Sequence, residues 1–103
     1  MDYAIVPRLE ELLKEWHEAG RVAFEQRWPA LDYDTYEGKR AVIKRKYVCL
    51  DEGISGVWLL ERATGQIYHI TATYGVPDRR KHLGHVDTIT GADLHRLRWW
   101  SLK

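Results

Sequence analysis

VWLLERATGQIYHI, residues 57–70, is the stretch that decides the fold, because two strand-like apolar runs in it are joined by a turn. The turn is Ala63-Thr64-Gly65, which has the composition of a three-residue hairpin loop. Gly65 stands where such a loop requires a left-handed backbone, a conformation that glycine adopts without steric strain. The stretch therefore predicts an antiparallel β-hairpin.

This three-residue loop also predicts a register, with Arg62 opposite Gln66. On one face of the hairpin it pairs Leu60 with Tyr68 and Trp58 with Ile70; on the other it pairs Leu59 with His69 and Val57 with Thr71. We expect a helix to cover the first, more aromatic face. The second face is also apolar, so the C-terminal segment or a partner molecule is expected to cover it.

Residues 6–28 have the periodicity of an amphipathic helix. Pro7 suits its first turn, and Pro29 ends it. Apolar or small side chains recur at intervals of three and four residues, at Leu9, Leu12, Leu13, Trp16, Ala19 or Gly20, Ala23 and Phe24. The sequence therefore predicts one long helix before the hairpin.

The two strands of the hairpin are expected at residues 56–62 and 66–74. A further strand is expected before them at 42–50, and a short fourth strand after them at 86–89, following an irregular basic stretch. Thr90 and Asp93 resemble a capping box, which predicts a short C-terminal helix. The expected fold class is α+β: a long N-terminal amphipathic helix packed on a three- to four-stranded antiparallel meander, followed by a short C-terminal helix. Residues 1–103 are expected to form a single domain.

Composition indicates a small soluble protein. Of its 103 residues 45% are hydrophobic and 30% are charged, which is typical of globular domains. No apolar run approaches the ~20 residues that span a bilayer, and no signal peptide is evident, so no membrane partner and a cytoplasmic location are expected. Cys49 is the only cysteine, which excludes an internal disulfide. The absence of asparagine fits either a thermophilic source or a GC-rich genome.

Motifs for catalysis are missing from the sequence. It has no nucleophile elbow, no phosphate-binding glycine loop and no dinucleotide fingerprint, so we expect no enzyme, no catalytic residues and no cofactor. His82 and His85 with Asp87 could bind zinc in a small hydrolase or nuclease, but histidines in a basic loop more often face solvent. We therefore predict no metal site.

Basic clusters carry the first functional hypothesis, a non-enzymatic domain that binds DNA or RNA. The expected phosphate contacts are Lys44, Arg45, Lys46, Arg79, Arg80 and Lys81, and Tyr74 or Trp100 would stack on bases. Because the net charge is only +1, these side chains would have to share one face of a polarised molecule. The alternative is a solvated face whose charges protect a sheet edge from aggregation.

Surplus aromatic residues carry the second hypothesis, a protein-interaction module. Trp99 and Trp100 are adjacent, so at least one of them is expected to be exposed. Exposed tryptophan is typical of interfaces. This module would bury Trp99 or Trp100, together with the sheet face of Leu59 and His69, against a host protein or a second copy of the chain.

The C-terminal half also resembles small uncharacterised proteins of phages and other mobile elements. The resemblance is carried by SGVWLLERATGQIY (55–68), YGVPDRRKHLG (74–84) and TITGADLHRLRWW (88–100). These motifs are turns and strands rather than reactive groups, so the resemblance implies no catalytic residues. It implies a context in which small domains bind a host protein or a nucleic acid, sometimes as inhibitors.

Overall fold

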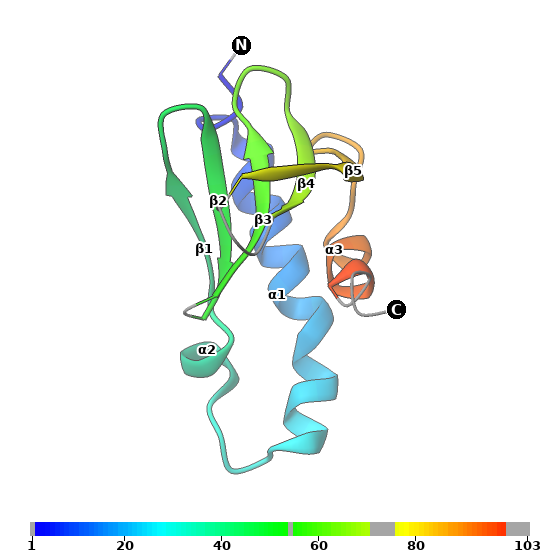
Figure 1. Cartoon of the computed structure of the whole chain (residues 1–103). Helices are drawn as coiled ribbons and strands as arrows, with labels where there is room; N and C mark the ends of the chain where they lie inside the picture. The colour runs from blue at the N-terminus through cyan, green and yellow to red at the C-terminus, as the bar shows by residue number, and fades with distance from the viewer. Residues whose placement is uncertain (1, 54, 71–75, 99–103) are drawn as a thin grey trace.

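The computed structural model of the protein describes residues 2–53, 55–70 and 76–98 and has an α+β architecture (Figure 1). The described residues form helices α1 (Pro7–Arg27), α2 (Tyr33–Tyr36) and α3 (Gly91–Leu97), and strands β1 (Lys39–Ile43), β2 (Tyr47–Glu52), β3 (Ser55–Glu61), β4 (Gln66–Ile70) and β5 (Pro77–His85). Neighbouring strands pair antiparallel in chain order. The predicted fold class is confirmed, with five strands instead of three or four.

Helix α1 matches the predicted range of 6–28 closely. Pro7 lies in its first turn, and its buried residues are Leu9, Leu12, Trp16, Gly20 and Phe24. Their spacing of three or four residues places them on one side of the helix. The helix ends where the N–H of Trp28 donates to the carbonyl of Phe24 at 2.8 Å, immediately before Pro29.

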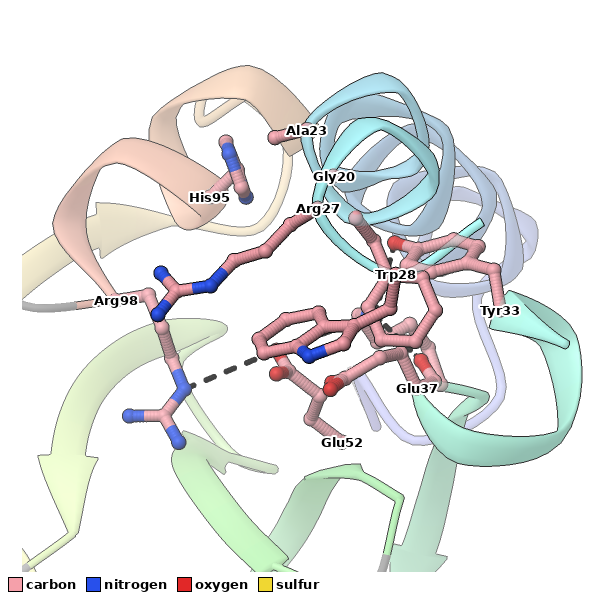
Figure 2. Close-up of a pocket in the computed structure, with 11 residues that line it drawn as sticks. Gly20, Ala23, Arg27, Trp28, Tyr33, Glu37, Glu52, His95 and Arg98 are labelled. Atoms are coloured by element: carbon pink, nitrogen blue, oxygen red, sulfur yellow. Dashed lines mark hydrogen bonds and ion pairs between the residues drawn. The ribbon is translucent and has the colours of Figure 1, made fainter. Parts of the chain in front are cut away.

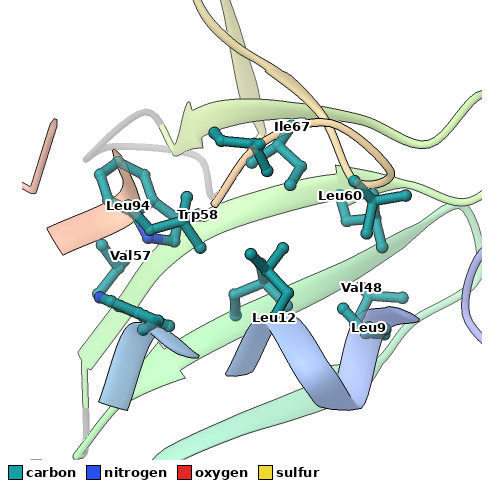
Figure 3. Packing of buried hydrophobic residues seen from close by; sticks show 12 residues of the cluster. Leu9, Leu12, Val48, Val57, Trp58, Leu60, Ile67 and Leu94 are labelled. Carbon is teal, nitrogen blue, oxygen red and sulfur yellow. The ribbon is translucent and has the colours of Figure 1, made fainter. Parts of the chain in front are cut away.

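Helix α1 covers one face of the sheet, which we call the inner face, and leaves the other, the outer face, without a helix (Figure 1). The hydrophobic core lies between α1, α3 and the inner face (Figure 3). A fully buried leucine or valine contributes about 1.5–3 kcal/mol to folding. The core consists of Leu9, Leu12, Trp16, Val48, Leu50, Val57, Trp58, Leu60, Ile67, Val86, Ile89 and Leu94.

The predicted strand at 42–50 is wrong, because a turn at residues 44–46 divides it into β1 and β2. The N–H of Lys44 donates to the carbonyl of Tyr47 at 2.8 Å and closes this turn. In a continuous strand, three consecutive cations would alternate between faces and direct one toward the core. The turn leaves all three cationic residues exposed.

The predicted register of the β3–β4 hairpin is wrong by one residue. β3 ends at Glu61 and β4 begins at Gln66, so the loop contains four residues rather than three. Within it, the N–H of Gly65 donates to the carbonyl of Glu61 at 2.8 Å. Gly65 has a φ of 78°, the left-handed conformation predicted for it. The observed pairs are Leu60 with Ile67, Leu59 with Tyr68 and Trp58 with His69. A one-residue shift moves every β4 side chain to the opposite face, so Ile67 joins the core and Tyr68 lies on the outer face.

The predicted strand at 86–89 is also wrong, because the basic stretch before it forms β5. Charged side chains are typical of an edge strand such as this one. Its pairing with β4 is irregular: Tyr68 lies opposite His82, whereas the next residue, His69, lies opposite Asp78. Residues 86–88 form a turn, and Val86 and Ile89 lie in the core. The Arg8 guanidinium donates to the carbonyls of both, at 3.2 and 2.7 Å.

The predicted capping box of α3 is confirmed. Thr90 Oγ1 accepts from the N–H of Asp93, and Asp93 Oδ2 accepts from the N–H of Thr90, both at 3.1 Å. The first residue of α3, Gly91, packs against the backbone of α1 and donates its N–H to Glu15 Oε1 at 3.1 Å. The short helix is therefore fixed at both its N-terminus and its contact with α1.

Candidate nucleic-acid interface

Charge is divided between the two layers of the fold. Residues 1–38, which contain α1 and α2, carry nine acidic and four basic side chains, whereas residues 39–85, which contain all the described strands, carry nine basic and four acidic ones. Summed charges of one sign on one face create a potential that attracts opposite charge. The sheet layer is therefore strongly basic although the whole chain has a net charge of only +1.

The β1–β2 turn presents three exposed cations, Lys44, Arg45 and Lys46, which we call the turn cluster. Arg62 holds the backbone of this turn in place. Its guanidinium donates to the Lys44 carbonyl at 2.8 Å, and its backbone N–H donates to the Lys46 carbonyl at 3.0 Å. Within the described part of the chain, none of the three side chains forms an ion pair. The turn cluster is thus fixed in place with its charges available.

Arg79 lies across the outer face and connects β5 to β2 and β3. Its guanidinium carbon is 4.7 Å from the centroid of the Tyr68 ring. Its Nη2 donates to Glu61 Oε2 at 2.9 Å and to the Tyr47 hydroxyl at 3.5 Å. Tyr47 directly follows the turn cluster in the chain. Arg79 of the second basic cluster therefore contacts the residue that directly follows the turn cluster.

The next two cations of β5 extend this surface. The side chain of Arg80 is 93% exposed, and its Nε lies 3.6 Å from Asp78 Oδ1. Lys81 is half-buried and forms no ion pair with a described residue. On the opposite edge of the sheet, the side chain of Arg40 in β1 is 66% exposed, and its Nε lies 3.2 Å from Asp51 Oδ2. The outer face is therefore bordered by cations along both edge strands.

Sequence reasoning missed three side chains of this face: Arg40, Tyr47 and Tyr68. Each follows the two-residue period of its strand, but Tyr68 was assigned to the covered face by the one-residue error in register. Tyr74, Trp99 and Trp100, which were predicted to stack on bases or bind a partner, lie outside the described residues.

The proposed partner-binding face of Leu59 and His69 does not exist as predicted. These residues are not paired and lie on opposite faces of the sheet. Leu59 pairs with Tyr68 on the outer face. His69 lies two positions after the core residue Ile67, and the centroid of its ring is 4.6 Å from that of Trp58. They are also buried, with exposed fractions of 3% and 6%. Neither side chain is accessible to a partner in this conformation.

A separate cavity of about 240 Å³ opens at the other end of the molecule, between α1, α2, the adjoining ends of β1 and β2, and α3 (Figure 2). Figure 2 shows charged and aromatic side chains from these elements converging on it. The chemically distinctive ones are Arg27, Trp28, Tyr33, Glu37, Lys39, Glu52, His95 and Arg98. Sequence reasoning missed this site, because its members come from segments far apart in the chain.

Two carboxyl groups lie against each other in this cavity. Burial, a hydrogen bond to Glu52 and the charge of Glu52 together raise the pKa of Glu37 to about 7. The Lys39 side chain is only 4% exposed and lies 3.9 Å from Glu52 Oε2. Burial lowers the pKa of Lys39, although the nearby carboxylates oppose that shift. The Nε of Arg98 lies 3.7 Å from the same Glu52 oxygen. The cavity therefore holds two acids and two bases in close contact.

The histidines considered as zinc ligands are only partly assembled. His85 Nδ1 lies 3.6 Å from Asp87 Oδ2, but His82 Nε2 is bonded to Gln66 Oε1 at 2.5 Å. Within the described ranges, no three His, Cys, Asp or Glu side chains are grouped so as to bind a metal ion together. Nor is any described helix long and apolar enough to span a membrane.

Comparison with known proteins gives no relative. No protein-family model, curated protein or solved structure matches the chain. The resemblance to phage proteins therefore stays a prediction, and any function has to be inferred from the chain's own geometry.

Proposed function

We propose that this protein binds nucleic acid through the outer face of its sheet. The single observation that carries the proposal is the segregation of charge, which gives the sheet layer nine basic and four acidic side chains and the N-terminal helical layer the reverse. A chain of near-zero net charge can bind a polyanion only if its cations share one face. The contact of Arg79 with Tyr47, the residue after the turn cluster, supports such a face.

Each part of this surface has a distinct role in the proposal. Phosphates contact the turn cluster, Arg80 and Lys81, whose side chains are available on the surface. Bases stack on the guanidinium plane of Arg79, which is 54% exposed above Tyr68. Stacking on arginine and aromatic planes is tolerant of sequence and is typical of single-strand recognition.

Salt dependence is the decisive property of such binding. We expect fluorescence anisotropy titrations with labelled single- and double-stranded DNA and RNA to show binding at ~50 mM salt. For the five phosphate contacts, affinity should fall about 100-fold for single strands and ~500-fold for duplexes on going to ~200 mM. Absence of binding to all four probes at ~50 mM would refute the proposal.

A matched pair of variants locates the surface. The double variant Lys44→Gln/Lys46→Gln removes two cations from the turn cluster, and Lys14→Gln/Arg27→Gln removes two cations from α1. The two variants have equal net charge, yet only the first should weaken binding. Its plot of log affinity against log salt concentration should have a slope that is shallower by about 1.4–1.8. Equal losses would show that the outer face is not the site. In that case a protein partner, bound through Trp99 and Trp100, becomes the interpretation to test by light scattering and pull-down.

A further inference from the structure

The outer face also carries three side chains of the kinds that cleave phosphodiesters. Glu61 of β3 and His82 of β5 flank a single unit, the guanidinium of Arg79 stacked on Tyr68. Arg79 bonds to Glu61 at 2.9 Å, and the His82 ring centroid lies 5.1 Å from that of Tyr68. A carboxylate, a guanidinium and an imidazole thus lie together in the middle of the basic surface.

We propose that Glu61, Arg79 and His82 cleave bound RNA by transferring the phosphate from O5′ to the adjacent 2′-hydroxyl group. This inference rests on the proposed function, because the substrate has to be held by the same face. It departs from the sequence-based expectation of a non-enzymatic domain, since no sequence motif brings these three residues together.

Glu61 has the environment of a proton acceptor. Its Oε1 accepts from the Thr64 hydroxyl at 2.7 Å and its Oε2 from Arg79 at 2.9 Å. These bonds hold the pKa of Glu61 below its ordinary value, so the carboxylate is ionised at neutral pH. Its side chain remains 22% exposed, which leaves an approach from solvent. The carboxylate is therefore fixed, charged and accessible and can accept a proton, but its lowered pKa makes it a weaker base than an unpaired glutamate.

His82 has the environment of a proton donor. Its Nε2 is bonded to Gln66 Oε1 at 2.5 Å, which fixes the orientation of an otherwise exposed ring. Its Nδ1 has no hydrogen-bond partner among the described residues. The imidazolium form carries a proton on each nitrogen. The Nε2 proton can stay in the hydrogen bond to Gln66 while the Nδ1 proton is given to a leaving group.

Arg79 supplies the charge between these two groups. Its Nη2 donates to Glu61 and Tyr47, and the guanidinium also hydrogen-bonds to Tyr68, which leaves its remaining N–H groups for a phosphate. Guanidinium groups bind phosphate oxygens through paired hydrogen bonds, and these bonds strengthen as negative charge develops in the transition state. Stacking on Tyr68 holds the group in place before the substrate arrives.

The step balances without a co-reactant. Glu61 accepts the proton of the 2′-hydroxyl, and O2′ forms a bond to phosphorus. The bond from phosphorus to O5′ breaks, and the His82 imidazolium gives its proton to O5′. The products are a 2′,3′-cyclic phosphate and a 5′-hydroxyl end, and exchange with solvent then returns both side chains to their starting protonation states. DNA has no 2′-hydroxyl group, so it should bind without being cleaved.

The test uses the full chain, a fluorescent single-stranded RNA and its all-deoxy counterpart, in buffer containing EDTA. We expect the RNA to be cut into fragments whose mass corresponds to 2′,3′-cyclic phosphate ends, and the deoxy strand to stay intact. Glu61→Gln and His82→Asn should each slow cleavage about 100-fold or more. Binding of the deoxy strand should change less than about threefold, and Glu10→Gln, on the exposed side of α1, should cleave as the wild type does.

The possible outcomes separate this inference from the proposed function. Cleavage that both variants lose while they still bind the deoxy strand supports the inference. Binding of RNA without cleavage overturns the inference and leaves the proposed function standing. Cleavage at the wild-type rate in both variants reveals a contaminating nuclease and also overturns it. Absence of binding to either strand overturns both. Because the two variants alter different strands, misfolding of one still leaves the other as a test.

Discussion

At the scale of single residues, the pair of carboxyl groups in the cavity is an electrostatically unfavourable arrangement. Glu37 and Glu52 hydrogen-bond to each other, and the positive charges of Lys39 and Arg98 lie near the same groups. Two ionised carboxylates within hydrogen-bonding range repel each other. The folded state therefore retains a proton that the unfolded chain releases. The pair therefore makes folding depend on pH.

Glu37→Gln should remove this pH dependence. The pKa of Glu37 is about 7 in the folded state and near 4.5 when unfolded. Below pH 4.5 the group is protonated in both states; between 4.5 and 7 only the folded state keeps the proton, so the free energy of unfolding falls as pH rises. After allowance for solvent screening, the loss is about 1–2 kcal/mol. Urea denaturation from pH 5 to 8 should show this decline in the wild type and a flatter profile in Glu37→Gln.

The matched control for this measurement is Glu10→Gln, which removes an exposed carboxylate from the first turn of α1. It should keep the wild-type decline. A decline of the same size in Glu37→Gln would mean that another group binds the proton.

At the scale of secondary-structure elements, sequence patterns predicted whole elements well and their relative placement poorly. The three-to-four-residue period of α1 and the capping box of α3 are local, and both are confirmed. The hairpin register depended on whether the loop held three or four residues. The composition of Ala63-Thr64-Gly65 is compatible with both loop lengths, so it does not predict which one forms. β5 was missed because edge strands tolerate charge and irregular pairing, so its sequence lacks the alternation of a buried strand.

Gly91→Ala tests how closely α3 packs on α1. A Cβ atom at this position would lie 2.1 Å from the carbonyl carbon of Glu15 and 2.2 Å from the backbone nitrogen of Trp16. Backbone atoms of a long helix cannot move aside as a flexible side chain can, so the helices must separate. We expect a loss of about 3 kcal/mol or more, measured by urea denaturation, because such overpacking exceeds the gain in helix propensity.

Helix propensity alone predicts the opposite sign, which makes the comparison decisive. Alanine is favoured over glycine by about 1 kcal/mol in a helix interior. Ala92→Gly, at the adjacent exposed position in the first turn of α3, should therefore cost at most about that much through propensity, without any clash. If Gly91→Ala proved as stable as the wild type, the close contact between α1 and α3 would be refuted.

At the scale of the whole molecule, the division of charge between layers explains how a chain of near-zero net charge can present a basic face. Sequence reasoning stated that condition but could not establish it, because the turn cluster and Arg79 are more than thirty positions apart and meet only through strand pairing. The same limit applies to the cavity and to the Glu61–Arg79–His82 group. Such sites are built from tertiary contacts, for which a single sequence gives no direct signal.

Ion-exchange chromatography tests this division without any ligand. At pH 8, close to the sequence pI of 7.9, evenly distributed charge would give weak retention on any resin. The molecule measures 41 × 30 × 21 Å, which exceeds the Debye length of about 10 Å at 0.1 M salt, so a resin interacts with one face rather than with the net charge. We expect retention on a cation exchanger through the sheet face.

Lys44→Gln/Lys46→Gln should elute at lower salt than Lys14→Gln/Arg27→Gln, although their net charges are equal. Coelution of the two variants would show that no basic face exists and would remove the basis for nucleic-acid binding.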